Sequence, residues 1–214
     1  MMNYLFKKYC DLIKNNIPSG RKNLAILISK HWMDLQDHYS INLYHDLSHI
    51  RTGLDELDKD TTPLEFRDEL EFAYFYHDVI VGCREAELLS SMFAINVRNS
   101  MKLILIPNVV VDCILETRFN NLMNTEVSRF PELNVIHDMD LVIFGKDRDK
   151  FINYDDAIIQ EYGAYFDKEM RAKILYKFYE NKKIYRTERY LDLYENKAKE
   201  NLKWILADRY GRKF

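Results

Sequence analysis

Four short segments of the chain place histidine and carboxylate side chains beside one another, in or next to apolar stretches. They hold four of the six histidines, and they read His45-Asp46-Leu47-Ser48-His49, Tyr76-His77-Asp78, Glu85-Ala86-Glu87 and His137-Asp138-Met139-Asp140. A single histidine beside an apolar stripe is usually a hydrogen-bonded core residue. The four segments together indicate a site of mixed imidazole and carboxylate ligands, which suits Mn, Mg, Fe, Co, Ni or Zn.

These ligand types predict one or two divalent ions used for hydrolysis. Neutral imidazoles leave the ion enough positive charge to acidify a bound water, and carboxylates offset part of that charge so that the ion is retained. His77 and Asp78 are adjacent in sequence. Neighbouring side chains point about 100° apart on a helix, so this pair can serve one ion only from a helix end.

The elements that position these residues are expected to be helices. Hydrophobic residues make up 47% of the chain, while Gly (6) and Pro (4) are scarce for 214 residues, which favours long helices over short strands. We predict an all-α, single-domain, multi-helix bundle over residues 1–214, with the metal site between central helices. A motif-bearing core would span about 40–145, and C-terminal helices at about 147–210 would pack on it.

Local signals place the individual helices. Two opening helices are separated by the breaker Pro18-Ser19-Gly20, and Asp46 is the expected N-cap of the next helix. Thr62 before Pro63 predicts the start of a central buried helix that runs to about Asp78. Gly145-Lys146-Asp147 joins two more helices. Further helices are expected over 84–100, 108–120, 132–144, 148–166, 168–181 and 187–208.

The composition also indicates where in the cell the protein is expected and which partners it is expected to bind. Cys10, Cys83 and Cys113 are far apart and contain no CxxC pair, so a cytoplasmic location fits better than a disulfide framework. No stretch resembles a membrane span or a signal peptide. The 31 basic and 34 acidic side chains nearly balance, so nucleic-acid binding is not supported. The expected partner is a small phosphorylated substrate, and a homodimer is left open.

In order and spacing, these segments resemble the HD-domain superfamily of phosphohydrolases. The shared features are a histidine at a helix start, a His-Asp doublet some tens of residues later, and a distal aspartate. The chain is most similar to a small subgroup of metal-dependent HD superfamily phosphohydrolases, over residues 40–203. The similar segments are 44–50, 73–80, 87–90 and 138–145, then Glu161-Tyr162, Arg171, 184–187, Glu195, Ala198 and Asn201-Leu202. It departs from that subgroup at Asp46, Ala86 and Asn120, where the subgroup has Asn, Asn and His.

The resemblance implies roles for individual residues. It makes His49, His77, Asp78 and Asp140 the metal ligands, with His45 and Asp138 as neighbours of the ligands or as alternative ligands. Asp78 and Glu87 are the candidate catalytic carboxylates, with Glu87 a candidate for polarising water and a solvated helix face as its alternative role. Arg51 is a candidate for binding phosphate, because a guanidinium can donate two parallel hydrogen bonds to phosphate oxygens.

The resulting functional hypothesis is a divalent-metal-dependent phosphohydrolase that acts on a phosphomonoester or phosphoanhydride, such as a nucleotide or a similar small metabolite. Two alternatives stay open. One is a di-iron HD-type oxygenase, because extra imidazole and carboxylate ligands could hold two irons. The other is a non-catalytic nucleotide-binding or scaffolding protein, for which Ala86 and Asn120 are the hints.

Overall fold

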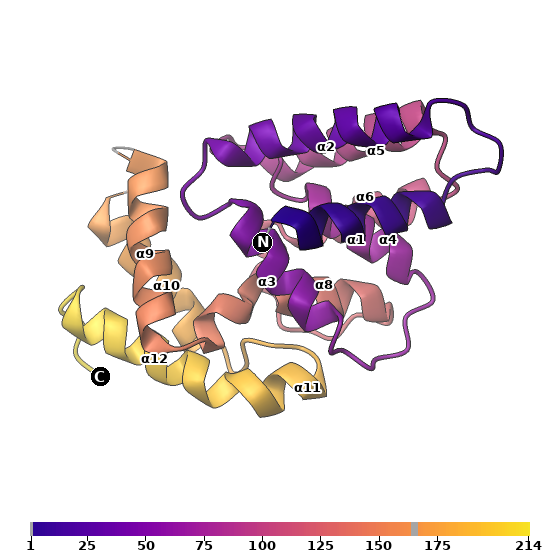
Figure 1. The fold of residues 1–214 in the computed structure, drawn as a ribbon. Helices are drawn as coiled ribbons and strands as arrows, with labels where there is room; N and C mark the ends of the chain where they lie inside the picture. The colour runs from indigo at the N-terminus through magenta and orange to yellow at the C-terminus, as the bar shows by residue number, and fades with distance from the viewer. Residues whose placement is uncertain (1, 164–166) are drawn as a thin grey trace. The chain divides into compact units, whose positions relative to one another are not determined.

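Helices form every regular element among the residues that the structure describes, 2–163 and 167–214, as the composition predicts. In this computed structural model the chain divides into two compact units, residues 1–118 and 119–214 (Figure 1). The predicted single domain, with its core at 40–145 and helices at 147–210 packed on it, stays a prediction. No described helix has both the length and the apolar character needed to cross a membrane.

The first unit is built around α4, whose residues are buried on nearly every side. Leu70, Phe72 and Phe75 have no exposed surface, so the helix contacts its neighbours all the way round. Those neighbours are α1, α3, α5 and α6. The helices of this unit are α1 (Met2–Asn15), α2 (Leu24–Ser40), α3 (Leu47–Leu57), α4 (Arg67–Tyr76), α5 (Ala86–Met101) and α6 (Pro107–Glu116).

Helix α3 begins where the sequence predicts. The carboxylate of Asp46 accepts hydrogen bonds from the backbone N–H groups of Ser48 (2.7 Å) and His49 (3.1 Å). These are two of the four N–H groups that the first turn of a helix leaves without a partner inside the helix. The cap therefore fixes His49 in the first turn of α3.

The predicted N-cap at Thr62 is wrong. Helix α4 begins five residues later, at Arg67, and ends at Tyr76. The side chain of Asp60 accepts from the backbone N–H of Thr62 at 2.8 Å, which holds this segment in a turn. The guanidinium of Arg67 donates to the carbonyl of Leu57 at 2.7 Å and ties the start of α4 to the end of α3.

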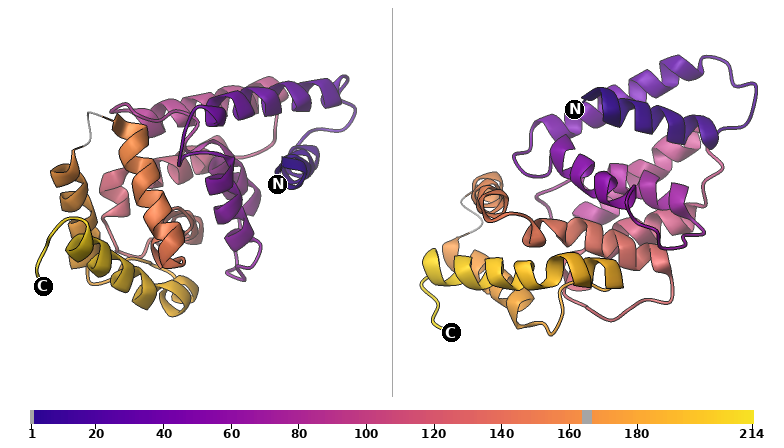
Figure 2. Two further views of the ribbon diagram at one scale, coloured as in Figure 1. Left: turned by 60° about the vertical axis from the view of Figure 1, so that its left-hand side comes forward. Right: turned by 60° about the horizontal axis from the view of Figure 1, so that its bottom comes forward.

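Helices α2 and α5 lie side by side (Figures 1 and 2). The rings of His38 and Phe93 are 4.9 Å apart near one end of the pair, and Ser100 Oγ lies 2.9 Å from His31 Nε2 near the other end. The two helices therefore run antiparallel. The inner face of α2 buries Ile28, Trp32, Leu35 and Tyr39.

The second unit is also helical. Predicted joints at 145–147 and 187 are confirmed, while the predicted end of the 148–166 helix at 166 lies outside the described residues. The elements are α7 (Phe119–Leu122), α8 (Pro131–Leu141), the 3₁₀ turn η1 (Val142–Gly145), α9 (Arg148–Tyr162), α10 (Lys168–Glu180), α11 (Glu188–Tyr190), the π-helical turn η3 (Leu191–Glu195) and α12 (Asn196–Asp208).

A buried ion pair holds α9 and α10 together. Arg171 Nε donates to Asp155 Oδ1 at 2.8 Å, and both side chains are almost fully buried. The other carboxylate oxygen accepts from the hydroxyl of Tyr210 at 2.9 Å and lies 3.4 Å from Arg209 Nη1. Asp155 therefore joins α9 to α10 and to the residues after α12.

We expect Asp155→Asn to destabilise the protein by about 3–5 kcal/mol, because it leaves the Arg171 charge buried without its counter-ion. Urea unfolding measures this effect. The matched control is Asp156→Asn, whose side chain is 59% exposed and pairs with Arg209 at the surface, and it should cost about 1 kcal/mol or less. Equal losses in the two variants would contradict the assignment.

Candidate metal centre

The structure brings together three of the predicted ligands, His49, His77 and Asp78, in the first unit. His49 lies in α3, and His77 and Asp78 directly follow α4. The Nε2 atoms of the two histidines are 3.1 Å apart. Asp78 Oδ2 lies 2.8 Å from His77 Nε2 and 3.5 Å from His49 Nε2. The two imidazoles, expected on different helices, are close enough to share one ion, although His77 directly follows α4 and does not lie within it.

The spacing of these three atoms fits a single divalent ion. Bonds of about 2.0–2.1 Å from a metal to nitrogen or oxygen place neighbouring ligand atoms about 2.9–3.4 Å from one another at tetrahedral or octahedral angles. The three measured separations span nearly the same range. The donor set, two imidazole nitrogens and a carboxylate oxygen, is one that first-row divalent metals accept.

His77 is oriented by the last turn of α4. Its Nδ1 lies 2.9 Å from the carbonyl oxygen of Tyr74, and since a carbonyl can only accept, Nδ1 carries the proton. The lone pair is therefore on Nε2, the atom that faces His49 and Asp78. The ring also stacks on that of Tyr74, with centroids 4.5 Å apart and planes 17° apart, and it is fully buried.

Aromatic rings enclose His49 on two sides. The ring of Tyr44 lies 4.9 Å from the His49 ring, and that of Tyr74 lies 5.9 Å from it. Only 6% of His49 is exposed. The site is therefore sheltered from bulk water, which strengthens electrostatic interactions within it.

Asp78 stays ionised in this setting. Burial by itself would raise the pKa of the carboxyl group, but the neighbouring imidazoles of His77, His45 and His49 hold the pKa well below its ordinary value. An ionised carboxylate is the form that binds a cation. The site thus keeps its negative charge at neutral pH.

His45 occupies an outer position. Its Nε2 is 3.9 Å from Asp78 Oδ2, farther than the corresponding atoms of His49 or His77, and its ring lies 6.0 Å from that of His49. The carbonyl of His45 accepts from the side chain of Asn42 at 3.0 Å. Between the two alternatives, the geometry favours His49 as the ligand and His45 as its neighbour.

Two other predicted site residues lie on the same unit. Glu87 is half-buried in the first turn of α5, one turn before Ser90, whose hydroxyl is 3.1 Å from the backbone nitrogen of Ile80. That contact ties the segment after Asp78 to α5. Arg51 is engaged elsewhere, because its Nε lies 3.4 Å from Asp55 and its guanidinium lies over the ring of Tyr4 at 5.1 Å.

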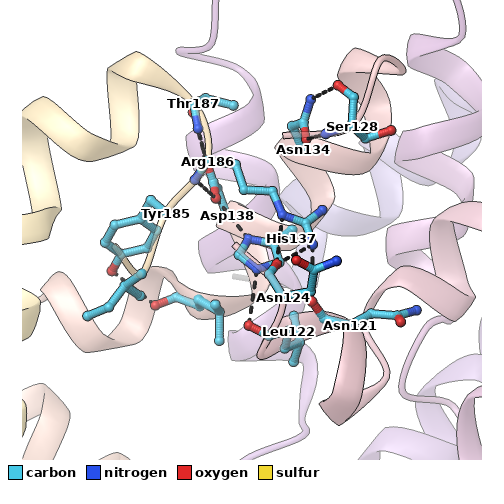
Figure 3. Close-up of polar contacts among 12 residues, drawn as sticks. Asn121, Leu122, Asn124, Ser128, Asn134, His137, Asp138, Tyr185, Arg186 and Thr187 are labelled. Atoms are coloured by element: carbon cyan, nitrogen blue, oxygen red, sulfur yellow. Dashed lines mark hydrogen bonds and ion pairs between the residues drawn. The ribbon is translucent and has the colours of Figure 1, made fainter. Parts of the chain in front are cut away.

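The second unit shows how the side chain of Asp138 is bound (Figure 3). Both oxygens of Asp138 are in use within this unit. Oδ1 accepts from the backbone N–H of Arg186 at 2.8 Å and lies 2.9 Å from His137 Nδ1. Oδ2 accepts from the N–H and the hydroxyl of Thr187, at 2.8 and 2.7 Å. Asp138 therefore has a structural role, whereas the participation of Asp140 as the fourth ligand stays a prediction.

The same polar cluster anchors the segment between α7 and α8. Arg186 donates to the carbonyls of Asn121 (3.0 Å) and Asn124 (2.6 Å), and His137 Nε2 lies 3.2 Å from the carbonyl of Leu122. Figure 3 shows Arg186 and His137 lying between Asp138 and the residues at 121–124. The sequence pointed to the 184–187 segment but gave no sign that its backbone binds Asp138.

Gly53 supports the site and was not singled out from the sequence. A Cβ atom at this position would lie 2.2 Å from Cζ and from the hydroxyl oxygen of Tyr74. Only glycine therefore lets the Tyr74 ring lie against α3 and stack on His77. The available signal was a glycine inside an expected helix, which often marks close packing.

Comparison with protein-family models, with curated proteins and with solved structures finds no match to this chain.

We expect Gly53→Ala to displace the ring of Tyr74 and with it His77, because the added methyl group has no space. The substitution should cost about 1–3 kcal/mol of stability, as overpacking does in other cores. It should also weaken binding of Co²⁺ or Mn²⁺, measured by calorimetry. Thr52→Ala, at the neighbouring position of α3, is the control and should change metal affinity little. Equal metal affinities of the wild type, Gly53→Ala and Thr52→Ala would exclude a role of the Tyr74 ring in metal binding.

We expect Asp138→Asn to destabilise the protein by about 1–3 kcal/mol, because its amide nitrogen would face N–H and O–H donors in place of an acceptor. Thermal unfolding followed by circular dichroism measures this. Asp140→Asn, two residues further along α8, is the matched control and should lower the unfolding temperature less. A larger loss from Asp140→Asn would reverse the two roles.

Proposed function

We propose that this chain is a divalent-metal-dependent phosphohydrolase. The observation that carries the proposal is the cluster of His49 Nε2, His77 Nε2 and Asp78 Oδ2, whose ligand atoms lie within 4.8 Å of one another. The proton on His77 Nδ1 and the ionised state of Asp78 both prepare these atoms to bind a cation. The resemblance of residues 40–203 to HD-domain phosphohydrolases supports the same function.

The proposal assigns distinct tasks to the side chains. His49, His77 and Asp78 would hold the ion, and Asp140 is assigned as the fourth ligand. When bound there, a divalent ion lowers the pKa of a coordinated water and polarises a phosphate oxygen. The carboxylate of Asp78 would accept a proton from the attacking water, and Glu87 is assigned to orient that water. His45 would keep Asp78 oriented through its position 3.9 Å from Oδ2.

The proposed substrate is a small phosphorylated metabolite, with a nucleotide as the leading class. The net charge of −3 gives the chain no overall attraction for a polyanion, which favours a small substrate over a nucleic-acid chain. The buried ring of Tyr74 and the half-buried ring of Tyr44 lie next to His49 and make one wall of the site apolar.

One observation favours a second candidate, a di-iron oxygenase. His45 adds a third imidazole 3.9 Å from Asp78, and extra imidazoles are what a second iron would require. The metal content of the purified protein, together with oxygen consumption in the presence of iron, separates this candidate from a phosphohydrolase.

The decisive substitution is Asp78→Asn, which keeps the size of the side chain and one acceptor oxygen but removes the charge. We expect the protein to stay folded while bound metal and metal-dependent phosphate release fall by more than 100-fold, beyond the roughly 10- to 100-fold that loss of a neighbour of a ligand costs. Circular dichroism, elemental analysis and phosphate release from a panel of nucleotides with Mn²⁺, Mg²⁺, Co²⁺, Ni²⁺ or Fe²⁺ are measured on one preparation.

The histidines supply matched controls. His49→Ala should behave as Asp78→Asn does, and His45→Ala should retain metal at reduced affinity. Arg51→Ala tests the phosphate role of that residue, which predicts a higher KM at unchanged metal content. Retained metal with near-normal turnover in Asp78→Asn would remove the basis of the proposal.

A further inference from the structure

Helix α2 has a second apolar face that none of the described residues of the first unit covers. While Trp32 and its neighbours point inward, Ile26 is 69% exposed, Met33 61%, and Ile41, directly after the helix, 81%. These three residues occur at intervals of seven and eight, about two turns each, so they lie along one side of the helix. In Figure 1 this helix is at the edge of its unit.

Two neighbouring cavities lie along this face. One, of about 540 Å³, is lined by residues of the second half of α2 and by Asn42, Asp46 and Leu47. The other, of about 500 Å³, is lined by residues 25–37 of α2. They share Met33 and Asp37. The face is about 22 Å long, at 1.5 Å per residue from position 26 to position 41, which suits a helix of about four turns better than a small ligand.

Two charged residues on this face, Lys30 and Asp37, would pair with each other between two copies related by a twofold axis. Lys30 and Asp37 are both exposed, and neither forms an ion pair with another residue of the described chain. They are seven residues apart, too far along the helix to pair with each other. An antiparallel copy of the same helix, centred between positions 33 and 34, would place each Lys30 opposite the other copy's Asp37.

We propose that α2 is the interface of a homodimer, in which the α2 helices of two copies pack antiparallel about a twofold axis beside Met33. In this register the Met33 side chains meet at the centre, two Lys30–Asp37 pairs flank them, and each Ile26 lies opposite Ile41. Ile26 then fills the larger cavity of the other copy, next to Ser40 and Asn42. Such an interface has apolar contacts at its centre, ion pairs beside them, and an apolar side chain at each end that packs into a cavity of the other copy. This arrangement suits an isologous helix–helix interface.

The test uses charge reversal and the full-length chain. Light scattering and sedimentation of the purified protein at 1–100 µM should show a concentration-dependent dimer. Lys30→Asp and Asp37→Lys each create two like-charged pairs, so each should weaken dimerisation by on the order of 10-fold or more. The double variant, Lys30→Asp with Asp37→Lys, restores both pairs in reversed order and should dimerise as the wild type does.

Mixing the two single variants gives the sharpest outcome. A Lys30→Asp copy and an Asp37→Lys copy form two attractive pairs with each other, so two weakly associating proteins should yield a heterodimer on mixing. Lys183→Asp, an exposed charge reversal on the second unit, is the control and should dimerise normally. Circular dichroism verifies folding of every variant.

A wild-type chain that is monomeric at 100 µM overturns the proposal. So does a dimer that is unaffected by either single reversal, or a mixture of the two that stays monomeric. In the last case the self-complementary register would be wrong. None of these results depends on metal or on phosphate release, so failure here leaves the proposed function untouched.

Discussion

The candidate site depends on one hydrogen bond, from Nδ1 of His77 to the carbonyl of Tyr74. The last carbonyls of a helix have no partner within the helix, and here one of them accepts from the first side chain beyond the helix. This contact fixes both the direction and the protonation of the imidazole. Since α4 is buried along its length, the position of His77 is set by the core of the unit.

The other side chains of the site in the first unit are also positioned by local contacts, namely a helix cap and close packing against a glycine. Asp46 caps α3 and thereby holds His49 in the first turn, and Gly53 admits the Tyr74 ring that supports both histidines. Asp78 then joins two imidazoles from separate segments. The candidate ligand side chains are thus held by helix ends and backbone groups, which are rigid. Metal ligands need such support because they must be held within about 0.5 Å of the binding geometry.

Sequence analysis identified the residues whose side chains can bind a metal, and it missed Gly53, which acts only through its small size. The helical class and the cap at Asp46 follow from local pattern and were confirmed. His49, His77 and Asp78, which the resemblance groups as ligands, do lie together, while their role as ligands stays a prediction. The predicted start of α4 was wrong: residues 60–62 form a turn in which Asp60 accepts from the N–H of Thr62, a contact that propensity does not reveal. Asp138 and Asp140 could not be separated, because the partners of Asp138 are backbone groups nearly fifty residues away.

The contact between Gly53 and Tyr74 also restricts how this sequence can drift in evolution. The pair is coupled by volume alone: a side chain at position 53 becomes tolerable only once position 74 has lost its ring, and a ring at 74 requires glycine at 53. A substitution at position 53 alone would pass through a strained intermediate, so the ring at position 74 should be lost first. Among descendants of this chain, a residue other than glycine at position 53 would therefore occur only with a residue without a ring at position 74.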